Sequence, residues 1–165
     1  MRMRRKKHLD KRLEALSDYL IVPEKDIVNV KEAIKDKKYL DFASVFNNDN
    51  RVELEIGCGK GRFITETAKL NPDINYIAIE KVEDVIVMAM EKAVEAELTN
   101  VLFTDMDAER IEDFFEYGEA ERIYLNFSDP WKKNKQAKRR LTHARYLAVY
   151  MELLKDGGIL RFKTD

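Results

Sequence analysis

From Arg51 onward, short apolar runs alternate with longer segments of helical character, and this alternation constrains the fold more than any other feature of the chain. A chain in which strands and helices alternate folds into a parallel sheet with helices on both faces, so we predict an α/β fold. The predicted strands are residues 52–56, 76–79, 101–103, 123–127 and 159–162, and the predicted helices are residues 62–70, 82–97, 111–115 and 142–154. Gly157 and Gly158 are expected to stop the last helix.

The part before Arg51 has a different character. The first seven residues carry five Lys or Arg and lead into no apolar core of a signal peptide, which indicates a flexible basic arm over residues 1–8. Leucines at helical spacing predict a short helix over residues 9–20, ended by Val22-Pro23, and a second helical segment is plausible around residues 30–45. We divide the chain into this arm, an N-terminal helical segment (9–50) packed on the core, and the core (51–165).

Composition narrows the class of protein. The chain has 165 residues, of which 45% are hydrophobic and 37% charged, enough for one domain with a real core. No apolar run is long enough to span a membrane. The single cysteine allows no internal disulfide and, with only two histidines, suggests no metal site. We therefore expect a cytoplasmic protein without a metal or a membrane partner, either a monomer or a homodimer.

A glycine-rich turn follows the first predicted strand. Gly57, Gly59 and Gly61 lie between strand and helix, where backbone amides can approach an anionic ligand without interference from side chains. Alone the pattern is weak, and a tight structural turn is the alternative interpretation. Arg62 occupies the place of the third glycine of the dinucleotide fingerprint, which makes a nicotinamide oxidoreductase the least favoured enzyme.

Acidic residues at the strand ends suit a nucleoside ligand. Glu80 ends the second strand and can accept hydrogen bonds from two ribose hydroxyls, although a solvated acid at a helix start is the simpler alternative. Asp107, or its neighbour Asp105, can accept from the exocyclic amine of adenine, unless both are solvated loop acids. Cys58 has no obvious base and is interpreted as a small turn residue.

Asp129 follows the fourth strand, at the edge where open parallel sheets bind ligands. An ionised carboxylate can accept from both N1–H and the exocyclic amine of guanine. N7, on the opposite edge, has a lone pair and can attack a sulfonium methyl without a general base. The ring becomes cationic as the methyl transfers, so Asp129 would position the base and stabilise that charge. Trp131 stacks on the base or packs over the sheet edge.

Cations gather beside this acid, although the formal net charge is only −1. Residues 132–145 carry seven Lys or Arg and no acid, and a polyanion responds to the local field. Lys133 is a candidate for contact with the substrate, and Lys135, Lys138, Arg139 and Arg140 are candidates for phosphate contacts. We assign His143 no role. The residues together predict an enzyme that methylates a base in RNA.

The sequence resembles the bacterial tRNA (guanine-N7)-methyltransferases, whose motifs it carries over nearly its whole length. The matching segments are 55–64, 79–81, Asp107-Ala108, Ser128-Asp129-Pro130-Trp131-Lys132-Lys133, 138–141 and 162–165. The resemblance implies a Rossmann-like class I methyltransferase sandwich and S-adenosyl-L-methionine as cofactor. It implies methylation of a guanine in the tRNA variable loop, with tRNA as the partner.

The resemblance also implies roles for single residues. Glu55, Glu80, Asp107 and Asp129 would line the cofactor site together with the turn glycines, and Asp129 would be the catalytic position. Lys133 and Asp165 would contact the substrate, and residues 135–140 would contact RNA.

Two departures from the family pattern are visible. Lys132-Lys133-Asn134 replaces Pro-Lys-Lys, and Ala137 replaces a histidine. The family continues beyond the position of Asp165 with further strands, so we expect a five-stranded sheet with an uncapped edge. The alternatives are a methyltransferase acting on another base or RNA, and a non-catalytic RNA-binding domain that uses the basic segment.

Overall fold

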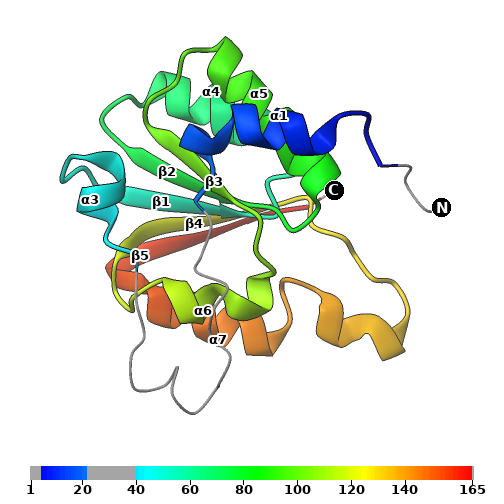
Figure 1. Cartoon of the computed structure of the whole chain (residues 1–165). Coiled ribbons are helices and arrows are strands. Elements are labelled where there is room, and N and C mark those ends of the chain that lie inside the picture. The colour runs from blue at the N-terminus through cyan, green and yellow to red at the C-terminus, as the bar shows by residue number, and fades with distance from the viewer. Residues whose placement is uncertain (1–4, 22–39, 165) are drawn as a thin grey trace, which may run out of the picture.

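Five strands form one parallel sheet, in the order β3-β2-β1-β4-β5, in a computed structural model that describes residues 5–21 and 40–164 (Figure 1). Two of the central strands are buried along their whole length. Residues 75–79 are apolar after Asn75, whereas residues 52–56 alternate apolar side chains with the buried Glu53 and Glu55. The strands are β1 (Val52–Ile56), β2 (Asn75–Ile79), β3 (Val101–Thr104), β4 (Ala120–Asn126) and β5 (Leu154–Lys163). The predicted parallel α/β fold is confirmed.

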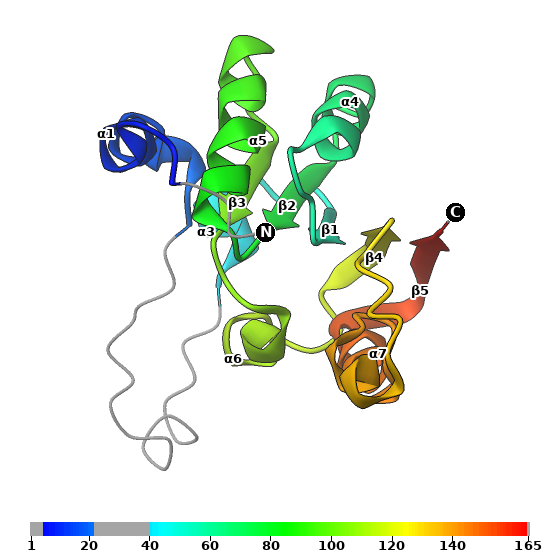
Figure 2. The ribbon, with the colours of Figure 1, turned by 90° about the vertical axis from the view of Figure 1, so that its right-hand side faces the viewer.

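Helices cover both faces of the sheet (Figures 1 and 2). One face is covered by α4 (Arg62–Leu70) and α5 (Glu83–Glu95), with α1 (Leu9–Ala15) outside α5. The other face is covered by α6 (Ile111–Phe114) and α7 (Ala144–Leu153). Each face has its own apolar core, and the buried strands supply both because their side chains alternate between the faces.

The N-terminal part packs against the edge of this core. The helix α1 ends earlier than predicted and is followed by a 3-10 helix, Ser17–Tyr19. Arg12 joins α1 to α5 through two hydrogen bonds of 2.7 Å to the Glu91 carboxylate. The Ile21 amide donates to the Phe103 carbonyl at 2.7 Å, which covers part of the edge of β3.

Two predictions fall on residues 22–39, outside the described part of the chain: the helix end at Val22-Pro23 and most of the segment 30–45. The described end of that segment contains α3 (Phe42–Phe46), which Asp41 caps by accepting from the amides of Ala43 and Ser44. The division into arm, helical segment and core stays a prediction.

The last strand was predicted to begin at residue 159, but β5 begins five residues earlier, at Leu154. The helix α7 ends at Leu153 and β5 begins at the next residue, because Leu154 turns to extended backbone and buries its side chain. Gly157 and Gly158 therefore lie inside β5 and do not stop the helix. They form a bulge, at which the pairing with β4 jumps from Ala120↔Leu154 to Arg122↔Ile159. A Cβ on Gly158 would lie 2.9 Å from the Lys155 carbonyl oxygen, so only glycine fits there.

The strand β5 forms the outer edge of the described sheet. Ile159 is 48% exposed and Phe162 52% exposed, in agreement with the expected uncapped edge. No helix in the described part of the chain is both long and apolar enough to cross a membrane. Within residues 5–21 and 40–164, no group of three or more His, Cys, Asp or Glu side chains could hold a metal ion.

Candidate active site

A cavity of about 270 Å³ opens at the carboxyl ends of the strands, beside the point where the strand order reverses between β1 and β4. Parallel α/β sheets bind their ligands at this topological switch point, because the loops on either side turn away in opposite directions. The wall is formed by Ile56, Gly57, Gly59, Ile79, Glu80, Lys81, Met106, Asp107, Ala108, Phe127, Ser128, Asp129, Trp131, Arg139, Leu141 and Tyr146.

The glycine turn offers this cavity a surface without side chains. Its amides point elsewhere: those of Gly57 and Cys58 donate to the Ile79 carbonyl at 2.8 and 3.0 Å, and that of Gly59 donates to Glu80. The predicted use of these amides toward an anionic ligand is therefore replaced by bonds within the fold. Gly61 does not line the cavity; a Cβ there would lie 2.5 Å from the Cβ of Ala89, so this glycine lets α4 approach α5.

The Glu80 carboxylate is oriented by two backbone donors. Its Oε2 accepts from the Gly59 amide and its Oε1 from the Val82 amide, each at 3.1 Å. Each carboxylate oxygen can accept more than one hydrogen bond, so both remain available to a ligand in the cavity. This geometry suits the bidentate acceptor for ribose hydroxyls that the sequence suggested.

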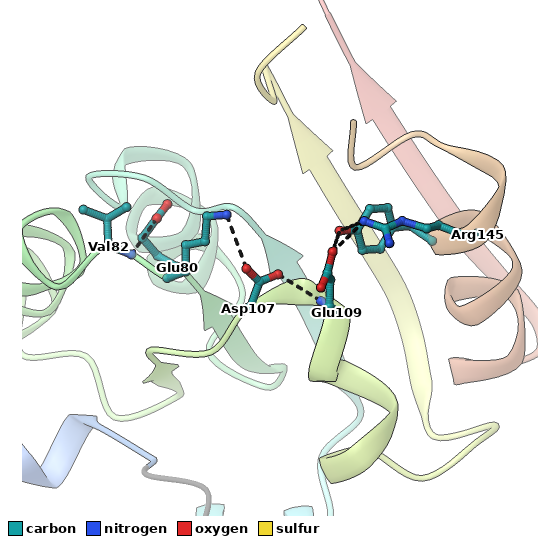
Figure 3. Close-up of polar contacts among 7 residues, drawn as sticks. Glu80, Val82, Asp107, Glu109 and Arg145 are labelled. Carbon is teal, nitrogen blue, oxygen red and sulfur yellow. Dashed lines mark hydrogen bonds and ion pairs between the residues drawn. The ribbon is translucent and has the colours of Figure 1, made fainter. Parts of the chain in front are cut away.

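Asp107 lies in the cavity wall between Glu80 and Glu109 (Figure 3). Its Oδ1 accepts from the Glu109 amide at 3.1 Å, and its Oδ2 pairs with the Lys81 ammonium at 3.3 Å. Asp105 is absent from the wall, so the structure favours Asp107 between the two candidates left open by the sequence.

A polar cluster beside Asp107 was missed by sequence reasoning. Arg145 donates to Glu109 Oε1 at 2.6 Å and to the Tyr146 hydroxyl at 2.9 Å, and that hydroxyl donates to Glu109 at 3.2 Å (Figure 3). Burial and the Glu109 charge raise the pKa of Tyr146, which keeps its hydroxyl protonated in the cavity wall. Arg145, counted with the basic segment, therefore braces α7 against the loop after β3. No local pattern reveals a pair separated by 36 residues.

Glu55 lies beneath the glycine turn and not in the cavity wall. It is 2% exposed, and its Oε1 accepts from the Asn126 side-chain amide at 3.0 Å. Its Oε2 has no hydrogen-bond partner among the residues that the structure describes. Burial raises the pKa of the Glu55 carboxyl to about 7, opposed in part by the Asn126 donor. Asn126 is a second residue that the sequence did not indicate.

Burial, together with the charges of Glu55 and Glu80, raises the pKa of the Cys58 thiol well above its usual range. The thiol is therefore protonated and a poor nucleophile, in agreement with its interpretation as a turn residue.

Asp129 lies on a loop with unusual backbone geometry. Phe127 and Trp131, which bracket it, have φ angles of 51° and 40°, in the left-handed region that non-glycine residues seldom occupy. Such geometry costs about 1–3 kcal/mol at each position and gathers at functional sites. The Arg139 guanidinium lies 5.2 Å from the centre of the Trp131 ring, and both residues line the cavity.

The fold thus brings Gly57, Gly59, Glu80, Asp107, Asp129 and Arg139 to one cavity. Lys133, Lys135 and Lys138 are exposed beside it, the last two on the 3-10 helix Asn134–Arg139. His143, which was given no role, caps α7 by accepting from the Arg145 amide. Asp165 lies outside the described residues.

Residues 49–165 match a family model described as "Putative methyltransferase". The tRNA (guanine-N(7)-)-methyltransferase of Clostridioides difficile (strain 630) is 46% identical over 165 residues, covering 100% of this chain and 72% of the relative. The chain belongs to this methyltransferase family. Its counterpart in Bacillus subtilis (strain 168) is 51% identical over 122 residues, which cover 74% of this chain and 57% of that protein. The resemblance expected from the motifs is confirmed.

Solved structures support the fold. A structure titled an antibiotic-related methyltransferase aligns with 78% of this chain and 68% of its own, with a TM-score of 0.59 and 21% identity. The antibiotic-resistance methyltransferase Kmr aligns with 73% of this chain and 62% of its own, with a TM-score of 0.57 and 25% identity. The Rossmann-like class I methyltransferase architecture is confirmed.

The residues of the cavity fit S-adenosyl-L-methionine, the cofactor of this family. Glu80 presents two acceptor oxygens for ribose hydroxyls and Asp107 an acceptor for the adenine amine. A Cβ on Gly59 would meet nothing within 4 Å, so open space lies over the turn. The unpartnered Oε2 of Glu55 is a fourth acceptor near the same turn, suited to an ammonium group.

Proposed function

We propose that this chain transfers a methyl group from S-adenosyl-L-methionine to N7 of a guanine in the variable loop of tRNA. One observation carries the proposal: Asp129, the acceptor suited to guanine, lies in the wall of the same cavity as Glu80 and Asp107, the acceptors suited to the cofactor. A methyl donor and its acceptor must meet at reacting distance, so both must bind to one site.

Asp129 orients the base and does not remove a proton. When bound, the cofactor supplies an electrophilic sulfonium methyl group. A guanine whose N1–H and exocyclic amine donate to Asp129 turns N7, on its opposite edge, away from the carboxylate. N7 carries no proton, so its lone pair would form the new bond to the methyl group without a general base, while the sulfur–methyl bond breaks and its electron pair stays on sulfur as a neutral thioether. The ring gains a positive charge in that step, and the Asp129 carboxylate favours this charge as it develops.

The aromatic and basic groups around Asp129 complete the substrate site. Trp131 lines the cavity and offers a ring face for stacking the base. Lys133, Lys135 and Lys138 are exposed beside it and bind phosphates, which contributes affinity but no sequence recognition. The partner is tRNA and the compartment the cytoplasm, with a monomer or homodimer as the active species. Because the chain spans 72% and 57% of two named relatives, these statements on the whole enzyme are proposals.

Methyl transfer from labelled S-adenosyl-L-methionine to unmodified tRNA tests the function. Chain cleavage at N7-methylguanine maps the product, which we expect in the variable loop. A labelled product with another base would support the alternative of a methyltransferase with a different target. No binding of S-adenosyl-L-homocysteine by a folded sample would support a non-catalytic RNA-binding domain.

Asp129→Asn supplies the mechanistic control. The variant retains the shape of the side chain but places a donor opposite the guanine donors. We therefore expect its dissociation constant for S-adenosyl-L-homocysteine to stay within about threefold of the wild-type value, and its rate of methyl transfer to fall by at least about a hundredfold. Transfer at the wild-type rate by this variant would rule out the assigned role of Asp129.

A further inference from the structure

Arg140 was expected to contact RNA, yet its guanidinium turns inward to the loop that carries Asp129. Its Nε donates to the Pro130 carbonyl at 3.0 Å and to the Trp131 carbonyl at 3.3 Å. Its Nη2 donates to the same Trp131 carbonyl at 3.1 Å. The N–H donors of a guanidinium point in fixed directions, so donors that bind these two carbonyls are not available to a phosphate.

The loop needs such support because its backbone is strained. The left-handed conformations of Phe127 and Trp131 persist only when surrounding contacts hold them. At the first end, the Phe127 amide donates to the Lys163 carbonyl at 2.8 Å, and the Lys163 ammonium lies 5.3 Å from the centre of the Phe127 ring. At the second end, Arg140 binds the two carbonyls that follow Asp129.

The basic segment that carries Arg140 contacts the Asp129 loop with some of its cations and leaves others exposed to solvent. Lys135 and Lys138 lie on the 3-10 helix Asn134–Arg139, directly before Arg140, and are exposed. Within the described part of the chain, no side-chain hydrogen bond or ion pair is found for either lysine. Arg139 lies over the Trp131 ring, and Arg140 holds the Trp131 backbone. Cations that look alike in sequence thus face solvent in the case of Lys135 and Lys138 and the Asp129 loop in the case of Arg139 and Arg140.

We propose that Arg140 is a positioning residue that clamps the 127–131 loop and thereby sets the place of Asp129, instead of binding RNA phosphate. Its effect on methyl transfer rests on the proposed function, whereas its effect on the loop does not. We therefore use two readouts: Trp131 fluorescence tests the clamp alone, and tRNA binding with methyl transfer tests the clamp together with the proposed function.

Tryptophan fluorescence reads the loop directly, because Trp131 is the only tryptophan in the chain. We compare Arg140→Gln with Lys138→Gln, which removes the same charge from the same segment without touching the loop. Arg140→Gln is expected to shift the Trp131 emission to the red and to raise its quenching by acrylamide. Lys138→Gln is expected to leave both unchanged. Arg140→Lys keeps the charge but loses the planar pair of donors, Nε and Nη2, so its Trp131 emission should lie between those of the wild type and Arg140→Gln.

Binding to tRNA and transfer provide the second readout. Lys138→Gln should lower the slope of log affinity against log salt by about 1, and Arg140→Gln should leave that slope as in the wild type. Single-turnover transfer should fall about a hundredfold for Arg140→Gln, since displacement of a reacting group by about 1 Å has this effect. An unchanged Trp131 signal for Arg140→Gln would overturn the clamp, and a salt slope lowered as in Lys138→Gln would assign Arg140 to RNA contact instead. The fluorescence result decides it even if the wild type transfers no methyl group.

Discussion

Replacement of Glu55 by glutamine should stabilise the protein at alkaline pH while weakening its hold on the cofactor. Glu55 is a buried residue of β1, and one of its carboxylate oxygens accepts a single hydrogen bond from Asn126 at the end of β4. Burial raises its pKa from the ordinary 4.5 to about 7. An ionised carboxylate in that place is costly, and the amide of glutamine has nearly the same shape without the charge.

The magnitude follows from the change in pKa. Each pKa unit corresponds to about 1.4 kcal/mol, so a rise from 4.5 to about 7 amounts to roughly 3 kcal/mol of lost stability once Glu55 is ionised. The unfolded chain loses this proton first as pH rises, because its pKa is the lower one. Stability therefore falls between about pH 4.5 and about pH 7 and stays low above that range. Glu55→Gln should recover about 1–3 kcal/mol at pH 8.5, or about 3–10 °C in Tm, and little at pH 5.

Urea denaturation at pH 5 and pH 8.5 measures this difference. Glu66→Gln serves as the control, because that side chain lies on the surface of α4 at 66% exposure and should change stability by less than about 0.5 kcal/mol at either pH. The same samples should show that S-adenosyl-L-homocysteine raises the Tm of the wild type but not of Glu55→Gln. A gain of equal size at both pH values, or a loss at pH 8.5, would refute the account of Glu55 as a destabilising buried charge kept for its ligand.

Three further predictions concern packing, the ribose site and RNA. Gly61→Ala should cost about 2–4 kcal/mol in urea denaturation because its Cβ would meet Ala89 at 2.5 Å, whereas Gly59→Ala, with open space around its Cβ, should cost about 1 kcal/mol; equal losses would contradict this. Glu80→Gln should weaken S-adenosyl-L-homocysteine binding in calorimetry about tenfold or more, and an unchanged dissociation constant would exclude it as a ribose acceptor. Deletion of residues 1–7 should lower the affinity for tRNA and the slope of log affinity against log salt, because it removes five Lys or Arg. The Lys6 amide donates to Asp84 of α5, so the end of this arm lies against the core. An unaltered slope would show that the arm does not touch RNA.

Local patterns were sufficient for most of the core. The strand β2 is buried on both faces and appears as an apolar run after Asn75. The strand β1 alternates apolar residues with Glu53 and Glu55, and the glycine turn that follows it marks its end. The order of strands and helices then implies which ends meet at one edge, which is why Glu80, Asp107 and Asp129 could be assigned to a single site. Gly157 and Gly158 misled the prediction, because a helix stop and a bulge require the same residue.

The sequence by itself determined the α/β fold, the family and the chemical types in the cavity, because these depend on the kind of residue and on its distance along the chain. The tertiary structure alone decided how those residues are used. Arg140 and Arg145 belong by sequence to a basic segment, yet the fold brings the first to the Trp131 carbonyl and the second to Glu109. Asn126 meets Glu55 across 71 residues. Contacts of this kind arise from packing of distant elements, and no local spacing encodes which donor will meet which acceptor.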